Sequence, residues 1–220
     1  MAEPSARAIA ARTHGRYLVA APAGSGPHPL LLGFHGYGEN AERCLAELRR
    51  IPGAERWLVA AVQGLHRFYN QKTGEVVASW MTKQDRELAI ADNVAYVGAV
   101  AGELRREFDL APTVALLGFS QGVAMAYRAA LGSVERAAAV IALAGDVPPE
   151  LHHLDLTRLG RVLVARGAAD ESYTADKMAA DAVLLRGKGL ACEELTYSGG
   201  HEWTDEFRRA VGEFLERLGP

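Results

Sequence analysis

A serine between two glycines is the residue of this sequence with the clearest chemical potential. Ser120 lies in the stretch GFSQG, residues 118–122, which fits the pattern G-x-S-x-G. The apolar run TVALL directly precedes this stretch and the helical run QGVAMAYRAAL follows the serine. Ser120 is therefore expected on a sharp turn between a strand and a helix, where glycines are needed because the backbone is strained and crowded. We predict that Ser120 is a nucleophile with an exposed hydroxyl group.

A histidine near the end of the chain is the expected general base. His201 lies in the stretch SGGHEW, after the last strand pattern and before the last helix pattern. The glycines before it allow a flexible loop at the sheet edge where Ser120 is expected. The other histidines are interpreted as surface, turn or loop residues. We therefore predict that His201 takes the proton of the Ser120 hydroxyl group.

An acidic residue is expected between the serine and the histidine, to orient the imidazole ring. Asp170 follows the strand pattern RVLVARG after a short loop, and it is the favoured candidate because this acid commonly leaves the strand next to the one before the histidine. Asp146 in the stretch GDVPP is the rival acid, and plain turn chemistry explains it equally well. Glu171 is a more distant third candidate.

A second glycine-containing loop is expected to stabilise negative charge on a substrate oxygen. It has the sequence GFHGYG, residues 33–38, and follows the first buried strand pattern. The backbone N–H groups of Tyr37 and Gln121 are predicted to form an oxyanion hole, and that of Gln121 lies at the start of a helix. His35 is interpreted as a hydrogen-bonding brace of this loop.

The elements that must position these residues alternate between strand and helix patterns. Strands are expected at residues 30–34, 57–62, 113–118, 137–143, 161–167 and 192–197, and helices at residues 40–50, 85–108, 121–131, 173–188 and 203–218. Two further short strands, at residues 8–13 and 16–20, are expected to form an antiparallel hairpin at the edge. This alternation predicts an α/β fold, a single domain over residues 1–220, with a mostly parallel sheet and helices on both faces.

The longest irregular stretch, residues 63–82, is the expected wall of the substrate pocket. Its middle, NQKTGEVV, predicts a small hairpin that turns at Thr73 and Gly74. Loops of this length in compact domains are usually functional. Aromatic side chains expected to line the pocket are Tyr37, Phe68, Tyr69, Trp80, Phe119 and Trp203. Ordinary core packing is an equally good interpretation of each of them.

Composition excludes several classes of function. The net charge is −3 and the basic residues form pairs rather than a stripe, which argues against nucleic-acid binding. Cys44 and Cys192 are far apart and have no metal-ligand spacing, so neither a disulfide framework nor a zinc site is indicated. Neither a signal peptide nor a membrane-spanning apolar run is recognisable. We therefore expect a cytoplasmic protein without an integral membrane segment.

With these residues in place, nearly the whole chain resembles the carboxylesterase/phospholipase family of small α/β-hydrolases, relatives of acyl-protein thioesterases and lysophospholipases. The resemblance rests on the stretches FHGYGEN, GFSQGVAMAYR, GAADESY and GGHEW, in the family's order and spacing. It implies catalysis by Ser120, Asp170 and His201, oxyanion amides from Tyr37 and Gln121, no large cap domain, and a homodimer. The chain departs from the family at residues 64–87, where the family usually has a shorter loop with proline and tryptophan.

The reaction expected of these groups is the hydrolysis of a small carboxylic ester through an acyl-enzyme, with no metal or organic cofactor. Thioester or lysophospholipid hydrolysis would use the same groups and differ only in pocket shape. The same triad could also transfer the acyl group to an acceptor other than water, or perform lyase chemistry. A catalytically silent binding protein on this fold is the alternative of another class.

Overall fold

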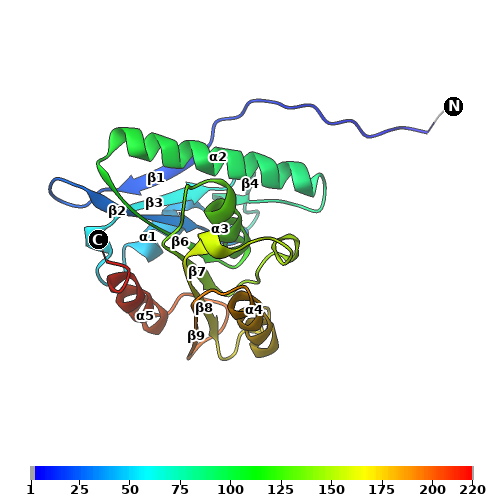
Figure 1. The fold of residues 1–220 in the computed structure, drawn as a ribbon. Helices are drawn as coiled ribbons and strands as arrows, with labels where there is room; N and C mark the ends of the chain where they lie inside the picture. The colour runs from blue at the N-terminus through cyan, green and yellow to red at the C-terminus, as the bar shows by residue number, and fades with distance from the viewer. Residues whose placement is uncertain (1–2, 220) are drawn as a thin grey trace.

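A seven-stranded sheet forms the centre of the computed structural model, which describes residues 3–219 (Figure 1). In chain order its strands are β1 (Arg16–Ala20), β2 (His28–Phe34), β3 (Leu58–Gln63), β6 (Leu110–Phe119), β7 (Ala139–Leu143), β8 (Arg161–Gly167) and β9 (Cys192–Tyr197). Their spatial order is β1-β3-β2-β6-β7-β8-β9. Only β1 is antiparallel to its neighbour, β3. The prediction of a mostly parallel sheet is confirmed.

Helices cover both faces of this sheet, as predicted. They are α1 (Ala41–Leu48), α2 (Arg86–Glu107), α3 (Gln121–Gly132), α4 (Ala175–Gly187) and α5 (Asp205–Glu216), with short 3₁₀ helices at Ala54–Arg56, Pro149–Leu151 and Thr157–Leu159. Side chains of α1 and α5 share one hydrophobic core with Leu31 of β2, whereas α2, α3 and α4 pack with Leu30 and Leu32 in the other. Successive strand residues therefore serve opposite layers, which explains why the central strands are continuous apolar runs. None of the helices within residues 3–219 is both long and apolar enough to cross a membrane.

The predicted N-terminal hairpin is wrong. Residues 8–13 adopt neither strand nor helix, and the segment before β1 extends away from the rest of the molecule (Figure 1). Ile9 is 93% exposed, because this alanine-rich segment has no core to pack against. The second predicted strand does form, as β1, but it pairs with β3. The edge strand is thus held by a long-range contact and not by a local turn.

A two-stranded hairpin lies within residues 63–82, as predicted. Its strands are β4 (His66–Tyr69) and β5 (Val76–Ser79), which pair antiparallel. The turn is closed by Gly74, whose backbone N–H donates to the Asn70 carbonyl group at 2.8 Å and whose φ is +70°. Ala78 of β5 also pairs with Glu39, so the hairpin supports the loop that follows β2.

Candidate active site

The carboxyl ends of neighbouring parallel strands bring the predicted chemical residues to one edge of the sheet. Ser120 follows β6, Asp170 follows β8 and His201 follows β9. The loop that contains His35 follows β2, which lies beside β6. This is the edge at which open α/β sheets place ligands.

Ser120 lies on a tight, strained turn between β6 and α3. Its φ of +52° and ψ of −119° are unusual for a residue with a side chain. The flanking glycines are required by close contacts: a Cβ atom on Gly118 would lie 2.3 Å from the Gly122 carbonyl oxygen, and one on Gly122 would lie 2.1 Å from the Phe34 carbonyl oxygen. The backbone N–H of Ser120 donates to the Leu143 carbonyl group at 2.8 Å. Neighbouring strands therefore hold the strained turn in place.

A hydrogen-bonded chain connects Ser120, His201 and Asp170. The distance from Ser120 Oγ to His201 Nε2 is 2.8 Å, and that from His201 Nδ1 to Asp170 Oδ2 is 2.9 Å. Because an ionised carboxylate can only accept, Nδ1 carries the hydrogen and Nε2 is left to accept from the serine hydroxyl group. The structure thus places the three predicted side chains in the order nucleophile, base and acid.

The Asp170 carboxylate is held in its ionised form. Burial is the largest influence and would raise its pKa, but N–H groups of Tyr173, His201 and Ser172 together outweigh it, and the pKa is lowered. The two backbone N–H groups, of Ser172 and Tyr173, reach Asp170 Oδ1 at 2.8 and 3.0 Å. The imidazole ring of His201 therefore has a fixed negative charge next to its Nδ1 atom.

The two other candidate acids do not contact His201. Asp146 is half exposed, and its Oδ2 atom lies 3.8 Å from Lys177 Nζ. Glu171 is exposed. Asp170 is therefore the acid that the structure brings to the imidazole ring.

The loop after β2 uses the N–H groups on either side of Tyr37 to fix its own conformation. The Gly36 N–H donates to Glu39 Oε2 at 2.8 Å, and the Gly38 N–H donates to the Ala78 carbonyl group at 3.0 Å. Among the described residues, none accepts from the backbone N–H of Tyr37 or of Gln121. Both predicted oxyanion donors are thus available, and sequence reasoning missed Glu39, which orders the loop.

His35 braces this loop as a neutral imidazole. Nδ1 lies 2.7 Å from the Gly36 carbonyl oxygen and must donate, whereas Nε2 accepts from the Gly64 N–H at 3.0 Å. The ring stacks on Trp80, with centroids 5.0 Å apart, and Trp80 Nε1 donates to the His35 carbonyl group at 2.9 Å. Burial lowers the pKa of His35 to about 4, although the bond to Gly36 raises it.

The Gln121 side chain ties the start of α3 to the end of the hairpin. Its Oε1 atom accepts from the Trp80 N–H at 3.0 Å, and its Nε2 atom donates to the Met81 carbonyl group at 3.2 Å. Ser79 Oγ lies 3.1 Å from the same Nε2 atom. Sequence reasoning assigned Gln121 only a backbone role, because the motif alone does not show which segment lies opposite its side chain.

A cavity of about 310 Å³ opens beside Ser120 and His201. It is lined by side chains from α2 and α3 and from the loops after β5, β7 and β8, including Met81, Arg86, Arg128, Asp146, Val147 and Tyr173. Both arginines were missed because a charged residue on a helix ordinarily faces solvent.

The aromatic residues predicted for the pocket lie elsewhere. Trp80 is buried under the loop of His35. Phe119 and Trp203 pack on each other, with Phe119 5.1 Å from the His201 ring. Tyr37 packs on Phe68, and Tyr69 is 66% exposed on the hairpin. These six side chains are absent from the described lining of the 310 Å³ cavity.

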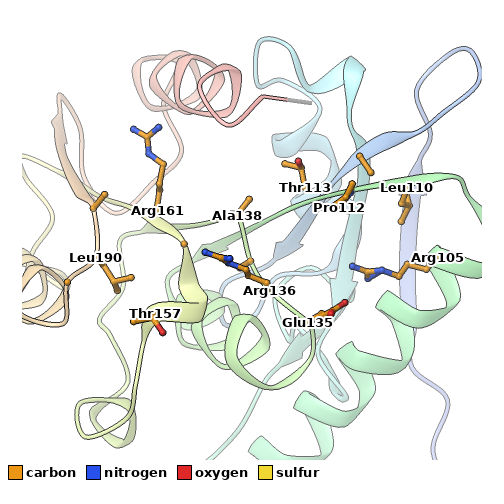
Figure 2. Close-up of a pocket in the computed structure, with 15 residues that line it drawn as sticks. Arg105, Leu110, Pro112, Thr113, Glu135, Arg136, Ala138, Thr157, Arg161 and Leu190 are labelled. Atoms are coloured by element: carbon orange, nitrogen blue, oxygen red, sulfur yellow. The ribbon is translucent and has the colours of Figure 1, made fainter.

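A larger cavity, of about 950 Å³, lies at the opposite edge of the sheet. Figure 2 shows Arg105, Arg136 and Arg161 around it, near the amino ends of β6, β7 and β8. The described residues that line it include no serine, cysteine or histidine. The smaller cavity is therefore the candidate active site, because the predicted nucleophile, base and acid meet beside it.

Comparison with known proteins relates the chain to a protein family. The model of a family described as Phospholipase/Carboxylesterase matches residues 16–218. No curated protein sequence matches the chain.

Solved structures of esterases and thioesterases have a similar fold. Esterase PE8 has a TM-score of 0.71 and 22% identity, over 93% of this chain and 98% of the esterase. Acyl-protein thioesterase 2 of Zea mays has a TM-score of 0.69 and 19% identity, over 93% and 99%. A carboxylesterase of Bacillus cereus has a TM-score of 0.70 and 16% identity, over 93% and 94%. At these identities the likeness shows the α/β-hydrolase fold.

Proposed function

The chain belongs to the phospholipase/carboxylesterase family, and from this premise we propose that it is a serine esterase that acts through an acyl-enzyme on Ser120. The observation that carries the proposal is the hydrogen-bonded chain from Ser120 Oγ through His201 to Asp170, with distances of 2.8 and 2.9 Å. Nucleophile, base and orienting acid in this geometry are the groups that acyl transfer requires.

In the first half-reaction, Ser120 Oγ attacks the carbonyl carbon of the ester while His201 Nε2 takes the hydroxyl proton. The ionised Asp170 stabilises the positive charge that forms on the imidazole ring. The carbonyl oxygen becomes an oxyanion, which the free N–H groups of Tyr37 and Gln121 accommodate, aided by the dipole of α3. His201 then protonates the leaving alkoxide, the alcohol departs, and the acyl group remains on Ser120.

In the second half-reaction, water replaces the alcohol. His201 Nε2 takes a proton from the water as its oxygen attacks the acyl carbon, and the same two N–H groups hold the second oxyanion. Collapse of this intermediate breaks the bond to Ser120 Oγ, and His201 returns the proton to that oxygen. The carboxylic acid leaves and the enzyme regains its starting state.

The size of the cavity favours esters with short acyl chains. Sites for drug-sized ligands are typically ~300–1,000 Å³, and the cavity beside Ser120 has about 310 Å³. A long alkyl chain would have to leave it along the surface. Thioesters and lysophospholipids with long chains are therefore second choices.

The test is hydrolysis of p-nitrophenyl esters from acetate to palmitate by the native protein and by Ser120→Ala. We expect a preference for short chains, and a loss of roughly 10⁴-fold or more in kcat for the variant. Ser172→Ala is the matched control, because Ser172 borders the same cavity but does not contact His201.

A fluorophosphonate probe provides a second measurement that needs no knowledge of the substrate. It should label the native protein and the Ser172→Ala control but not Ser120→Ala. Hydrolysis that survives in Ser120→Ala would contradict the proposed nucleophile. Absence of both labelling and hydrolysis in the native protein would favour a binding protein on this fold. A preference for palmitate would move the proposal to thioesters or lysophospholipids.

A further inference from the structure

Two guanidinium groups line the cavity beside Ser120. Arg86 begins α2, and Arg128 lies on α3. Gln121 and Ala124 also line the cavity, and the spacing 121, 124, 128 places all three residues on one face of α3. The helix that carries the N–H group for the oxyanion therefore also carries an arginine into the substrate cavity.

Arg128 is buried and has donor capacity left over. Its side chain is 4% exposed. Nε and Nη2 donate to Glu150 Oε1 at 2.9 and 2.5 Å, but among residues 3–219 Nη1 meets only the sulfur of Met81, at 3.7 Å. A thioether is a weak acceptor. Because Met81 lines the same cavity, a substrate oxygen can take over the Nη1 donor.

The charged side chains that line the cavity beside His201 are Arg86, Arg128 and Asp146, which together carry one net positive charge. Behind the lining, the Asp181 carboxylate accepts from the Val147 N–H and the Tyr173 hydroxyl group, and these bonds hold it away from the arginines.

Glu150 forms ion pairs with both arginines: its Oε1 atom contacts Arg128, and its Oε2 atom lies 3.4 Å from Arg86 Nη2. One carboxylate thus faces two guanidinium groups. Asp146, which also lines the cavity, is balanced by Lys177 at 3.8 Å.

Asp170 does not cancel this excess. It bonds to His201 Nδ1, whereas the cavity side of the ring is Nε2 at Ser120. Its charge is therefore directed at the imidazole ring and not into the cavity.

We propose that this cavity selects esters that carry a carboxylate a few bonds from the reacting carbonyl group, held by Arg86 and Arg128. Eight residues of helix separate the Cα atoms of Ser120 and Arg128 by ~12 Å along the axis. Arginine side chains on a helix lean toward its N-terminus. The distance from the Ser120 hydroxyl group to the Arg128 guanidinium group is therefore shorter than the Cα separation, and a small substrate can bridge it. The inference rests on the proposed esterase function and specifies its substrate class.

The test compares two methyl esters that differ only in charge. Monomethyl glutarate carries a carboxylate, and methyl 5-methylhexanoate carries an isopropyl group of similar shape in its place. Release of methanol gives kcat/KM for each ester. We expect the anionic ester to be favoured by roughly tenfold or more, since hydrogen bonds to a charged group of this kind typically contribute that much.

Two variants test the role of the arginines. Arg86→Gln should lower the preference for the anionic ester by roughly tenfold, because one donor and the excess charge are lost. Glu150→Gln should raise the preference, because it removes the competing carboxylate while the amide oxygen can still accept from Arg128. Arg56→Gln is the matched control: Arg56 is exposed, pairs with Glu216 away from the cavity, and its loss changes the net charge equally.

A second substrate pair tests whether the carboxylate belongs to the alcohol part of the ester. It consists of 4-carboxyphenyl acetate and 4-isopropylphenyl acetate. Preference for the anionic member of either pair, with the expected response of both variants, supports the inference and identifies the half of the ester involved. Preference for the neutral member in both pairs, or ratios that neither variant changes, would overturn it.

A binding measurement separates this inference from the proposed function. If the native protein hydrolyses none of the four esters, the esterase proposal fails. Calorimetric titration of Ser120→Ala with monomethyl glutarate then still decides the inference. Binding that is lost on adding Arg86→Gln would support an anion-selective cavity, and no binding would refute it.

Discussion

Acidification should destabilise the protein through His35, a residue that does not take part in the proposed chemistry. The His35 ring is 1% exposed, Nδ1 donates to Gly36, and Nε2 accepts from the Gly64 N–H. A proton on Nε2 would replace this acceptor by a donor that faces another donor, in a buried place. The folded protein therefore favours the neutral imidazole ring, and for this reason burial lowers the pKa of His35.

The size of the effect follows from the two states of His35. Its pKa is about 4 in the folded protein against an ordinary value of 6.5. Between these values the unfolded chain binds a proton that the folded protein does not, so stability falls as pH falls. Relative to pH 7, the loss in the free energy of unfolding is about 2 kcal/mol at pH 5 and about 3 kcal/mol at pH 4. This contribution is fully present only above the ordinary value of 6.5.

Urea unfolding at pH 7, 5 and 4, followed by tryptophan fluorescence, measures this loss. Trp80 stacks on His35 and reports on the same loop. His35→Gln is the comparison, because an amide can bond to Gly36 and Gly64 without titrating. The native protein should lose about 3 kcal/mol more than His35→Gln between pH 7 and pH 4.

Equal losses in the two proteins would refute the reasoning on His35. Should the variant fail to fold at pH 7, the ring signals of His35 in the native protein, followed by NMR, decide instead. A midpoint near 6.5 in folded protein would then contradict a buried neutral ring.

Two further predictions concern Asp170, the proposed orienting acid, and a buried hydroxyl group. Asp170→Asn should lower kcat by about 10⁴-fold, because the amide no longer holds the tautomer of His201 that accepts the serine proton; Asp146→Asn should cause a far smaller loss in the same ester assay, and equal losses would contradict the assignment of the acid. Tyr127→Phe should raise the free energy of unfolding by about 1 kcal/mol, because within residues 3–219 the Tyr127 hydroxyl group is buried without a hydrogen-bond partner. Guanidinium unfolding measures this gain, and a loss of stability would show that the hydroxyl group has a partner after all.

The layered α/β fold was predictable because burial on both faces leaves a strong pattern in the sequence. The strands at residues 161–167 and 192–197 have the bounds that were predicted for them. The first is a continuous apolar run apart from its ends, as a strand between two helical layers must be. The second follows a helix and a glycine-containing turn, so its beginning was marked locally. Where the sequence carries such local signals, the bounds of a strand can be predicted from it.

Long-range contacts account for what the sequence did not predict in the fold. β1 was expected to pair with the segment just before it, yet it pairs with β3, about 40 residues later. A tight turn at Gly15 would satisfy local rules, but the backbone there packs directly against the Tyr96 ring of α2. Pairing with β3 extends the sheet and half-buries both faces of the strand, Tyr17 and Val19 against one core and Leu18 and Ala20 against the other.

Within the candidate site, local motifs were likewise predictable from the sequence, whereas long-range contacts were not. The positions of Ser120, Asp170 and His201 follow from motifs at strand ends, so sequence could bring them together. The lining could not be predicted, because an aromatic side chain such as Trp80 packs instead against His35 in the loop after β2. A charged residue on a helix ordinarily faces solvent, but Arg128 is buried where it pairs with Glu150 of the 3₁₀ helix Pro149–Leu151.

Backbone strain provides an independent reason to place function at the smaller cavity. Within the described chain, the non-glycine residues with φ in the left-handed region are Asp85, Ser120 and Ala144. Ser120 and Ala144 line the 310 Å³ cavity, and Asp85 directly precedes Arg86, which also lines it. Such conformations cost ~1–3 kcal/mol each and persist where the surrounding structure imposes them. The strain is concentrated beside the proposed nucleophile and the proposed anchor for a carboxylate. The larger cavity is about three times as big, and its described lining has no strained residue of this kind.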